Sequence, residues 1–308
     1  MTRITVPSFA KLNLDLRVLQ RRPDGYHELR TIFQTISLAD TLSIEFEFAK
    51  RTQIELASSV EIPQNLVLRA AEAALDQMKI KAWVRFVLTK RIPMGTGLGG
   101  GSSNAATVLR ALPVLARKPV DPANWVRIAE SLGSDVPFFL YGGTAVGLGR
   151  GGELYPLPDQ PPRPALVVTT GIHVSTAEAY RALCRPLADP LTSVVQSPIL
   201  GEFQTIAWAL HGSRSFRLPF TNDFEPIVFR MHPQLAAVAR KLRRLGASPA
   251  LMTGSGSAVY GIFGTTAEAR SAAAKFPPGS AFPVRFVSRK RYESVWRHPN
   301  RAATARER

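Results

Sequence analysis

Five of the seven residues from 95 to 101 are glycine, and Ser102, Ser103 and a helical pattern follow them directly. Glycine adopts backbone conformations closed to other residues and lets N–H groups approach an anion with no Cβ in the way. A helix that begins directly afterwards adds unpaired N–H groups and the positive end of its dipole. The pattern therefore predicts a phosphate-binding loop.

Two well-known phosphate loops fit this stretch poorly. A Walker A loop needs a lysine near its end, and residues 93–109 contain none. Gly95, Gly97 and Gly100 match the dinucleotide pattern G-x-G-x-x-G, with Asp121 about 20 residues later as the ribose ligand. However, Asp121 precedes Pro122 at a predicted helix start, whereas ribose recognition needs an acid at the end of a strand. A dinucleotide-dependent oxidoreductase stays open as an alternative.

Other catalytic classes lack their residues. The chain has no G-x-S-x-G elbow for a hydrolase, and Thr31 stands where a zincin needs the second histidine after His27-Glu28. The single cysteine, Cys184, excludes a disulfide or a cysteine-based zinc site within the chain. We therefore expect a reducing, cytoplasmic location.

Length and composition predict a folded protein of about two domains. The 308 residues are 45% hydrophobic and 20% charged, with a net charge of +16. Such a charge suits an anionic ligand, so a nucleic-acid-binding protein stays open as a second alternative, but no basic patch is interleaved with aromatic residues, which argues against a nucleic-acid partner. Apolar runs fall well short of the roughly 18 residues that span a bilayer, so we expect no membrane partner either.

Apolar periodicity and turn signals predict mixed strands and helices without regular βαβ alternation, which favours an α+β fold. Asp24-Gly25 predicts a turn, and the proline-rich segment 156–164 predicts a linker. Strands are expected at 3–7, 12–19, 29–38, 41–48, 53–56, 83–88, 165–170, 257–263 and 283–288. Helices are expected at 65–78, 102–115, 121–133, 176–184, 200–211, 223–231, 233–245 and 266–275.

Four groups of residues resemble the GHMP kinases, the family of galactokinase, homoserine kinase and mevalonate kinase. Pro93-Met94-Gly95-Thr96-Gly97-Leu98-Gly99-Gly100-Gly101-Ser102-Ser103-Asn104-Ala105-Ala106 is similar to their ATP loop. The N-terminal segments 8–15 and 21–28, the segment Gly133–Phe139 and the segment Thr253–Ser257 resemble further family motifs, in the family's order.

The resemblance implies a two-domain GHMP kinase fold, with a ribosomal-protein-S5-like N-terminal domain at 1–160 and a ferredoxin-like C-terminal domain at 161–296. Residues 297–308 would form a disordered basic tail. The long glycine loop implies ATP-dependent phosphorylation, with Mg²⁺, of the 2-hydroxyl of 4-diphosphocytidyl-2-C-methyl-D-erythritol in the non-mevalonate route to isoprenoids. Another GHMP kinase, of the homoserine or mevalonate type, is the nearest alternative. The chain would be a monomer or a homodimer.

The resemblance also implies roles for individual residues. Asp135 would take the proton of the substrate hydroxyl, and Lys11 would lower the pKa of that hydroxyl and orient Asp135. The predicted ATP-binding residues are Pro93, Met94, Gly95, Thr96, Gly97, Leu98, Gly99, Gly100, Gly101, Ser102 and Ser103, with Ser103 also a contact to Mg²⁺. The predicted substrate-binding residues are Asn13, Tyr26, His27, Tyr180, Gly254, Ser255 and Gly256.

Overall fold

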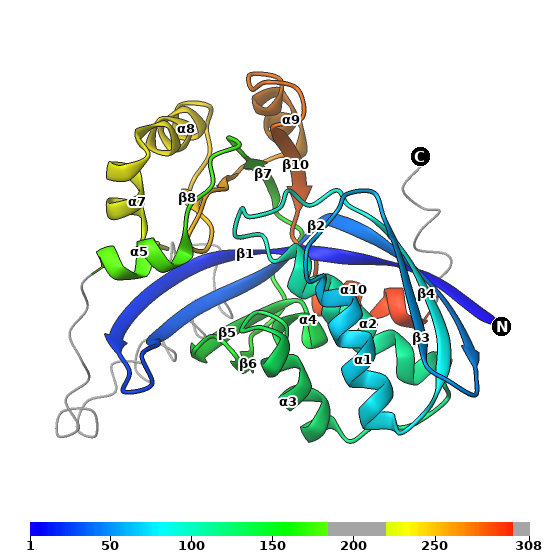
Figure 1. Cartoon of the computed structure of the whole chain (residues 1–308). Coiled ribbons are helices and arrows are strands. Elements are labelled where there is room, and N and C mark those ends of the chain that lie inside the picture. The colour runs from blue at the N-terminus through cyan, green and yellow to red at the C-terminus, as the bar shows by residue number, and fades with distance from the viewer. Residues whose placement is uncertain (184–219, 298–308) are drawn as a thin grey trace.

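The computed structural model describes residues 1–183 and 220–297 (Figure 1). The first part of the chain contains the strands β1 (Thr2–Arg21), β2 (His27–Phe48), β3 (Gln53–Ser58), β4 (Ala82–Thr89), β5 (Thr144–Gly149) and β6 (Glu153–Pro156), and the helices α1 (Leu66–Met78), α2 (Gly100–Leu115), α3 (Pro122–Leu132) and α4 (Phe138–Tyr141). The later part contains β7 (Pro164–Val168), α5 (Thr176–Ala182), α7 (Glu225–Met231), α8 (Pro233–Arg244), β8 (Ala250–Met252), β9 (Val259–Ile262), α9 (Thr266–Ala273), β10 (Ala281–Arg285) and α10 (Arg289–Arg297).

The first sheet is organised around the long strand β2. Strand β1 pairs antiparallel with β2 along nearly its whole length, from Thr2 opposite Phe46 to Arg21 opposite His27. On the other edge of β2, its first half pairs with β5 and its second half with β4. The sequence predicted two shorter strands in place of each of β1 and β2. The structure joins them, and the β1–β2 register shifts instead on both sides of Lys11 and Asn13.

Helices α1 to α4 cover one face of this sheet, below the β1–β2 ribbon in Figure 1. Apolar residues of α1 and α2 pack against β2 and β4 to form one core cluster, which includes Ala71, Leu75, Val108, Ile44 and Phe86. Helix α1 begins where the sequence predicts, because Asn65 accepts a hydrogen bond from Val67 N at 3.0 Å.

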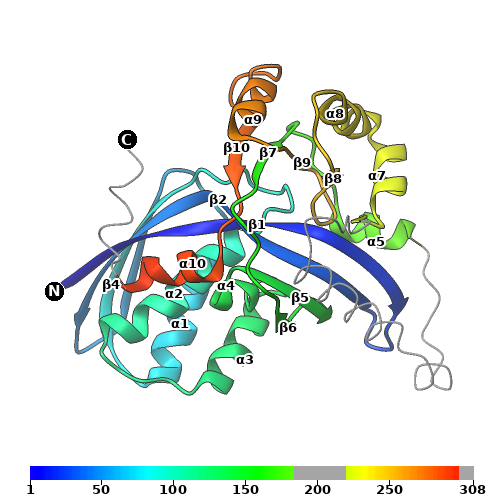
Figure 2. The same ribbon diagram turned by 180° about the vertical axis from the view of Figure 1, so that it is seen from behind.

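The second sheet has the strand order β10-β7-β9-β8 and is antiparallel. Helices α8 and α9 lie on its outer side, and its inner face packs on the β1–β2 ribbon (Figure 2). That interface is a core cluster in which Leu12, Leu14 and Ile32 of the ribbon pack with Val167 and Tyr260 of the second sheet. The ribbon is therefore buried between the helices of the first sheet and the second sheet.

The described residues confirm most of the expected helices, with ends within a few residues of the predictions. The helix expected at 200–211, Cys184 and residues 298–308 of the predicted tail lie outside the described residues, whereas Arg297, where the disordered tail was predicted to begin, is the last residue of helix α10. The predicted domain boundaries stay a prediction. In the two described ranges, no helix combines the length and the apolar character needed to cross a membrane.

Helix α10 is a feature that the sequence analysis missed. Its many basic residues make the apolar stripe of Tyr292, Val295 and Trp296 hard to recognise in the sequence. This stripe packs against Val6 and Phe9 at the start of the chain. The Tyr292 hydroxyl donates a hydrogen bond to Phe139 O at 2.5 Å. Helix α10 therefore supports the segment that contains Asp135 and α4.

Replacing Tyr292 with Phe should lower the free energy of unfolding by about 1–3 kcal/mol, because the buried Phe139 carbonyl loses its donor while the ring packing remains. Urea unfolding followed by circular dichroism measures this change. Tyr155→Phe, which removes an exposed hydroxyl bonded to Glu153, is the matched control and should change stability by less than about 0.5 kcal/mol. Equal effects in the two variants would contradict the supporting role of α10.

Candidate active site

Lys11 and Asp135 form an ion pair although 124 residues separate them in sequence. Lys11 Nζ lies 3.2 Å from Asp135 Oδ2; the lysine side chain is 3% exposed and the aspartate 33%. Lys11 comes from β1, and Asp135 comes from the turn between α3 and α4. A buried ammonium group thus meets a carboxylate that still reaches solvent, which is an arrangement suited to proton transfer at a bound hydroxyl.

Asn13 holds the lysine in place. Its Oδ1 accepts a hydrogen bond from Lys11 Nζ at 2.6 Å, and its Nδ2 donates to Thr31 Oγ1 at 2.7 Å. Thr31 in turn donates to Asp15 O at 2.8 Å. Lys11 and Asn13 are two residues apart on β1, so the alternation of the strand points both side chains to the same face, and the register shifts lie on either side of this pair.

The glycine loop runs between β4 and α2, as predicted. Gly95, Gly97 and Gly99 have φ values of +68°, +79° and +73°, which side chains with a Cβ rarely adopt. Leu98 O accepts a hydrogen bond from Lys11 N at 3.0 Å, so the loop lies directly on β1 beside the ion pair. A Cβ at Gly99 would lie 2.9 Å from the Phe139 ring and 3.2 Å from the Lys11 side chain.

The third glycine-rich segment, 253–257, contacts this loop. Ala258 N donates to Thr96 O at 3.1 Å, and a Cβ at Gly97 would lie 2.5 Å from Thr253 O. The Thr253 hydroxyl also accepts a hydrogen bond from Asn13 N at 2.9 Å. The two glycine segments, one from each sheet, therefore meet backbone to backbone beside Lys11.

A cavity of about 1070 Å³ opens from the ion pair toward the β1–β2 turn and α5. Its lining includes the following predicted residues: Lys11, Asn13, Tyr26, His27, Gly97, Ser102, Asp135, Tyr180, Gly254 and Ser255. The His27 ring stacks on Tyr180 with the ring centroids 4.9 Å apart, and Tyr26 lies at the rim, 51% exposed. The structure therefore gathers the residues predicted for two different ligands around one cavity.

Other predicted residues lie behind the cavity wall. Thr96, Leu98 and Ser103 are buried, and Leu98 packs in the cluster between the two sheets. Pro93, Met94, Gly95, Gly99, Gly100, Gly101 and Gly256 also lie outside the cavity lining. The Ser103 hydroxyl is buried and has no hydrogen-bond partner in the part of the chain that the structure describes.

Three arginines at the cavity received no site role in the sequence analysis: Arg21, Arg150 and Arg181. The Arg150 guanidinium lies 3.5 Å from the centroid of the Tyr26 ring. No motif marks Arg150 or Arg181, and Arg21 is only the first residue of the segment 21–28, although the charge of all three belongs to the basic excess visible in the composition. They make one end of the cavity suited to an anion with a flat ring beside it.

Burial sets the ionisation of the two stacked rings. Burial, assisted by the positive charge of Arg21, lowers the pKa of His27 from its usual 6.5. Burial, assisted by the negative charge of Asp135, raises the pKa of Tyr180 above its usual range. Both rings are therefore uncharged at neutral pH, which suits stacking with a neutral heterocycle.

Comparison with known proteins identifies the family. The model for the GHMP kinase N-terminal domain matches residues 65–143, and the model for the C-terminal domain matches residues 200–278. A 4-diphosphocytidyl-2-C-methyl-D-erythritol kinase from Solibacter usitatus is 52% identical over 290 residues, which cover 94% of this chain and 90% of that protein. The chain belongs to the GHMP kinase family. It is a small-molecule kinase, and GHMP kinases use ATP as the phosphate donor.

Solved structures agree with this placement. A 4-(cytidine 5'-diphospho)-2C-methyl-D-erythritol kinase superposes with a TM-score of 0.76 at 38% identity, covering 92% of this chain and 99% of that chain. A homoserine kinase from Cytophaga hutchinsonii superposes with a TM-score of 0.66 at 16% identity, covering 94% and 95%, and shows the shared fold alone. The predicted GHMP kinase fold is confirmed. The dinucleotide alternative finds no support, since Asp121 caps α3 by accepting a hydrogen bond from Ala123 N.

Gly97→Ala should weaken nucleotide binding by about tenfold or more, because a Cβ would enter the space of Thr253 O and force the two glycine segments apart. Calorimetric titration with a non-hydrolysable ATP analogue measures the change. Gly171→Ala is the matched control, since Gly171 also has a positive φ, +72°, but has nothing within 4 Å of the added Cβ. Unchanged nucleotide affinity in Gly97→Ala would show that this contact does not shape the loop.

The His27 ring should titrate below pH 6.5, because burial and Arg21 disfavour the charged form. His27 is then neutral at pH 7 and gains its proton only as the pH falls through its lowered pKa. NMR of the imidazole C–H protons, with His27→Gln to assign the resonance, measures the midpoint. A midpoint at or above 6.5 would contradict the buried, Arg21-facing position of the ring.

Proposed function

We propose that this protein transfers the γ-phosphoryl group of ATP to the 2-hydroxyl of 4-diphosphocytidyl-2-C-methyl-D-erythritol, giving the 2-phosphate and ADP. The reaction belongs to the non-mevalonate route to isoprenoids. The observation that carries the proposal is the Lys11–Asp135 pair, which stands where the glycine loop meets a cavity lined by aromatic rings and arginines. The 52% identity to a relative of this name supports the choice of substrate.

The ion pair accounts for the chemistry at the acceptor. The Asp135 carboxylate takes the proton of the 2-hydroxyl as that oxygen forms a bond to the γ-phosphorus, and the bond from the γ-phosphorus to the bridging oxygen of ADP breaks. Lys11 stabilises the negative charge that develops on the oxygen. Phosphoryl transfer depends mainly on positioning and electrostatic stabilisation, so one base and one buried cation are sufficient at this end.

The glycine loop accounts for the phosphate donor. Its positive-φ glycines and the start of α2 direct backbone N–H groups toward the γ- and β-phosphates of ATP. Mg²⁺, when bound, would supply positive charge that offsets the negative charge of these phosphates. The buried Ser103 hydroxyl has no partner among the described residues, so it fits the role of a metal contact. The same residues contain no cluster of three acidic, histidine or cysteine side chains, so phosphate oxygens and water would supply most ligands.

The far end of the cavity accounts for the cytidine diphosphate group. Tyr26, His27 and Tyr180 offer flat neutral rings to the base, and Arg21, Arg150 and Arg181 offer positive charge to the diphosphate. Asn13, beside Lys11, would contact the erythritol hydroxyls, and Gly254 and Ser255 would close the cavity from the second sheet, with Gly256 directly behind them. A homoserine or a mevalonate has neither a ring nor a diphosphate to fill this end.

We also propose a division into domains at 1–160 and 161–296, a cytoplasmic location and a monomeric or homodimeric state. The location rests on the single cysteine, which leaves no disulfide within the chain.

The deciding experiment measures ADP release by the purified protein with Mg²⁺-ATP, with and without 4-diphosphocytidyl-2-C-methyl-D-erythritol. Substrate-dependent ADP release, with the new phosphate located on the 2-hydroxyl by phosphorus NMR, would support the proposal. A folded protein that binds ATP but releases no additional ADP would overturn the choice of substrate. Homoserine and mevalonate, tested alongside, identify the alternative kinases.

Asp135→Asn should lower kcat by about 10²- to 10⁴-fold, because the amide cannot take the proton of the hydroxyl. The KM for ATP should stay within about twofold, because the nucleotide contacts come from the glycine loop. Steady-state kinetics measures both values. Asp76→Asn, an exposed change on α1 outside the cavity, is the control and should leave kcat unchanged. A variant at position 135 that retained most of its turnover would remove Asp135 as the base.

A further inference from the structure

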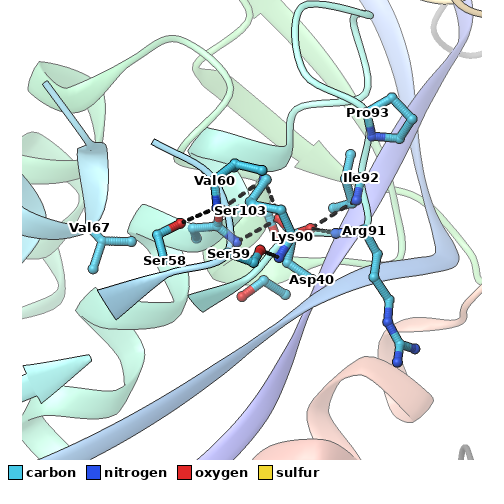
Figure 3. Close-up of polar contacts among 12 residues, drawn as sticks. Asp40, Ser58, Ser59, Val60, Val67, Lys90, Arg91, Ile92, Pro93 and Ser103 are labelled. Carbon is cyan, nitrogen blue, oxygen red and sulfur yellow. Dashed lines mark hydrogen bonds and ion pairs between the residues drawn. The ribbon is translucent and has the colours of Figure 1, made fainter. Parts of the chain in front are cut away.

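Asp40 is a carboxylate with no exposed surface in the middle of β2, and no motif or expected role includes it. Figure 3 shows its side chain beside Lys90, Arg91 and Ile92, at the end of β4. Its Oδ1 accepts hydrogen bonds from Arg91 N at 2.7 Å and from Ile92 N at 2.9 Å. Its Oδ2 accepts one from Asn104 Nδ2 at 3.0 Å and a short one from Lys90 Nζ.

These four donors flank the glycine loop on both sides. Arg91 and Ile92 directly precede Pro93, where the loop begins, and Asn104 lies in α2 directly after Ser103, where it ends. One carboxylate therefore fixes both ends of the loop to β2. Asp40 does this from outside the cavity lining of the described residues, so it acts on a ligand only through the loop.

The Lys90 ammonium gives Asp40 a second task. The Lys90 side chain is 6% exposed, and its Nζ would lie 3.1 Å from a Cβ at Gly100, the first residue of α2. A cation at the positive end of a helix dipole is unfavourable unless an anion balances it. Asp40 supplies that anion, and Asn104 Oδ1 accepts a further hydrogen bond from Lys90 Nζ at 3.3 Å.

We propose that Asp40 is a positioning residue for the phosphate donor: it holds the two ends of the glycine loop and so sets the affinity for ATP. The inference rests on the proposed function for the role of the loop. Loss of the Asp40 carboxylate should therefore weaken the binding of ATP and not that of the cytidine substrate. Within the described ranges, the proposed base-binding residues Tyr26, His27 and Tyr180 have no hydrogen bond or ion pair with Asp40 or its four donors.

Asp40→Asn tests the proposal. The amide oxygen can still accept from Arg91 N and Ile92 N, but the NH₂ group then faces the Lys90 ammonium and the Asn104 amide. The dissociation constant of Mg²⁺-AMPPNP, measured by calorimetry, should rise about tenfold or more, since bonds to charged groups are among the stronger ones. The KM for the cytidine substrate should stay within about twofold. Hydrogen exchange of peptides covering 91–101 should be faster in the ligand-free variant.

Glu45→Gln on the same strand is the matched control. Glu45 pairs with Arg3 and Arg85, both largely exposed, so this variant should bind nucleotide and exchange like the wild type. Asn104→Ala is the second variant and removes one donor to Asp40 while leaving Lys90 paired. It should weaken AMPPNP binding by about threefold and also speed exchange in 91–101. If Asp40→Asn does not fold, this variant decides the test.

Nucleotide affinity within twofold of wild type in a folded Asp40→Asn protein, or unchanged exchange in 91–101, would overturn the inference. So would an equal rise in the KM for both substrates. Binding of AMPPNP and hydrogen exchange need no second substrate. A wild-type protein that binds AMPPNP but does not turn over the cytidine substrate would therefore refute the proposed function and leave the Asp40 test intact.

Discussion

The contact between the two glycine segments is the constraint on which the rest of the structure depends. Gly97 and Thr253 O approach so closely that no Cβ fits between them, and Ala258 N bonds to Thr96 O across the same junction. The contact ties the loop that would hold ATP to the second sheet, and Asn13 N bonds to the Thr253 hydroxyl from the ribbon between them. These contacts fix the position of Lys11 relative to both sheets. An in-line transfer between two bound ligands requires such fixed positions.

Local signals in the sequence were sufficient for much of the fold. Asn65 and Asp121 begin their helices as predicted, and Asp24-Gly25 makes the turn between β1 and β2, with Gly25 at a φ of +84°. Strand lengths could not be predicted in the same way. Residues 6–16 are buried on both faces between helices and a second sheet, so alternation fades where the ribbon is most buried. The glycines of β5 lowered its apparent strand propensity, and the charges of α10 obscured its apolar stripe.

The residues of the candidate site also fall into two groups: those that the sequence predicted and those that only the structure shows. Lys11, Asp135 and the glycine loop were found because each lies in a segment that resembles a family motif, and the structure brings them together. Arg150 and Asp40 carry no such mark. The contact of Arg150 with the Tyr26 ring exists only because the β5–β6 turn places its guanidinium there. The role of Asp40 likewise depends on the fold, which brings three donors from residues 90–92 and one from Asn104 to its carboxylate. Such roles are properties of the tertiary structure, which local patterns do not encode.

The hydrogen bond from Tyr292 to Phe139 also bears on the order in which the protein matures. Synthesis proceeds from the N-terminus, and early domains generally fold first. Phe139 and the Lys11–Asp135 pair belong to segments made early, but the helix that supports them is made only after every strand of the second sheet. The core cluster that contains Val6 and Phe9 is likewise complete only after Val295 has been synthesised. A nascent chain stopped before α10 would contain every described residue of the candidate site but would lack the helix that packs against Phe139 and the start of β1.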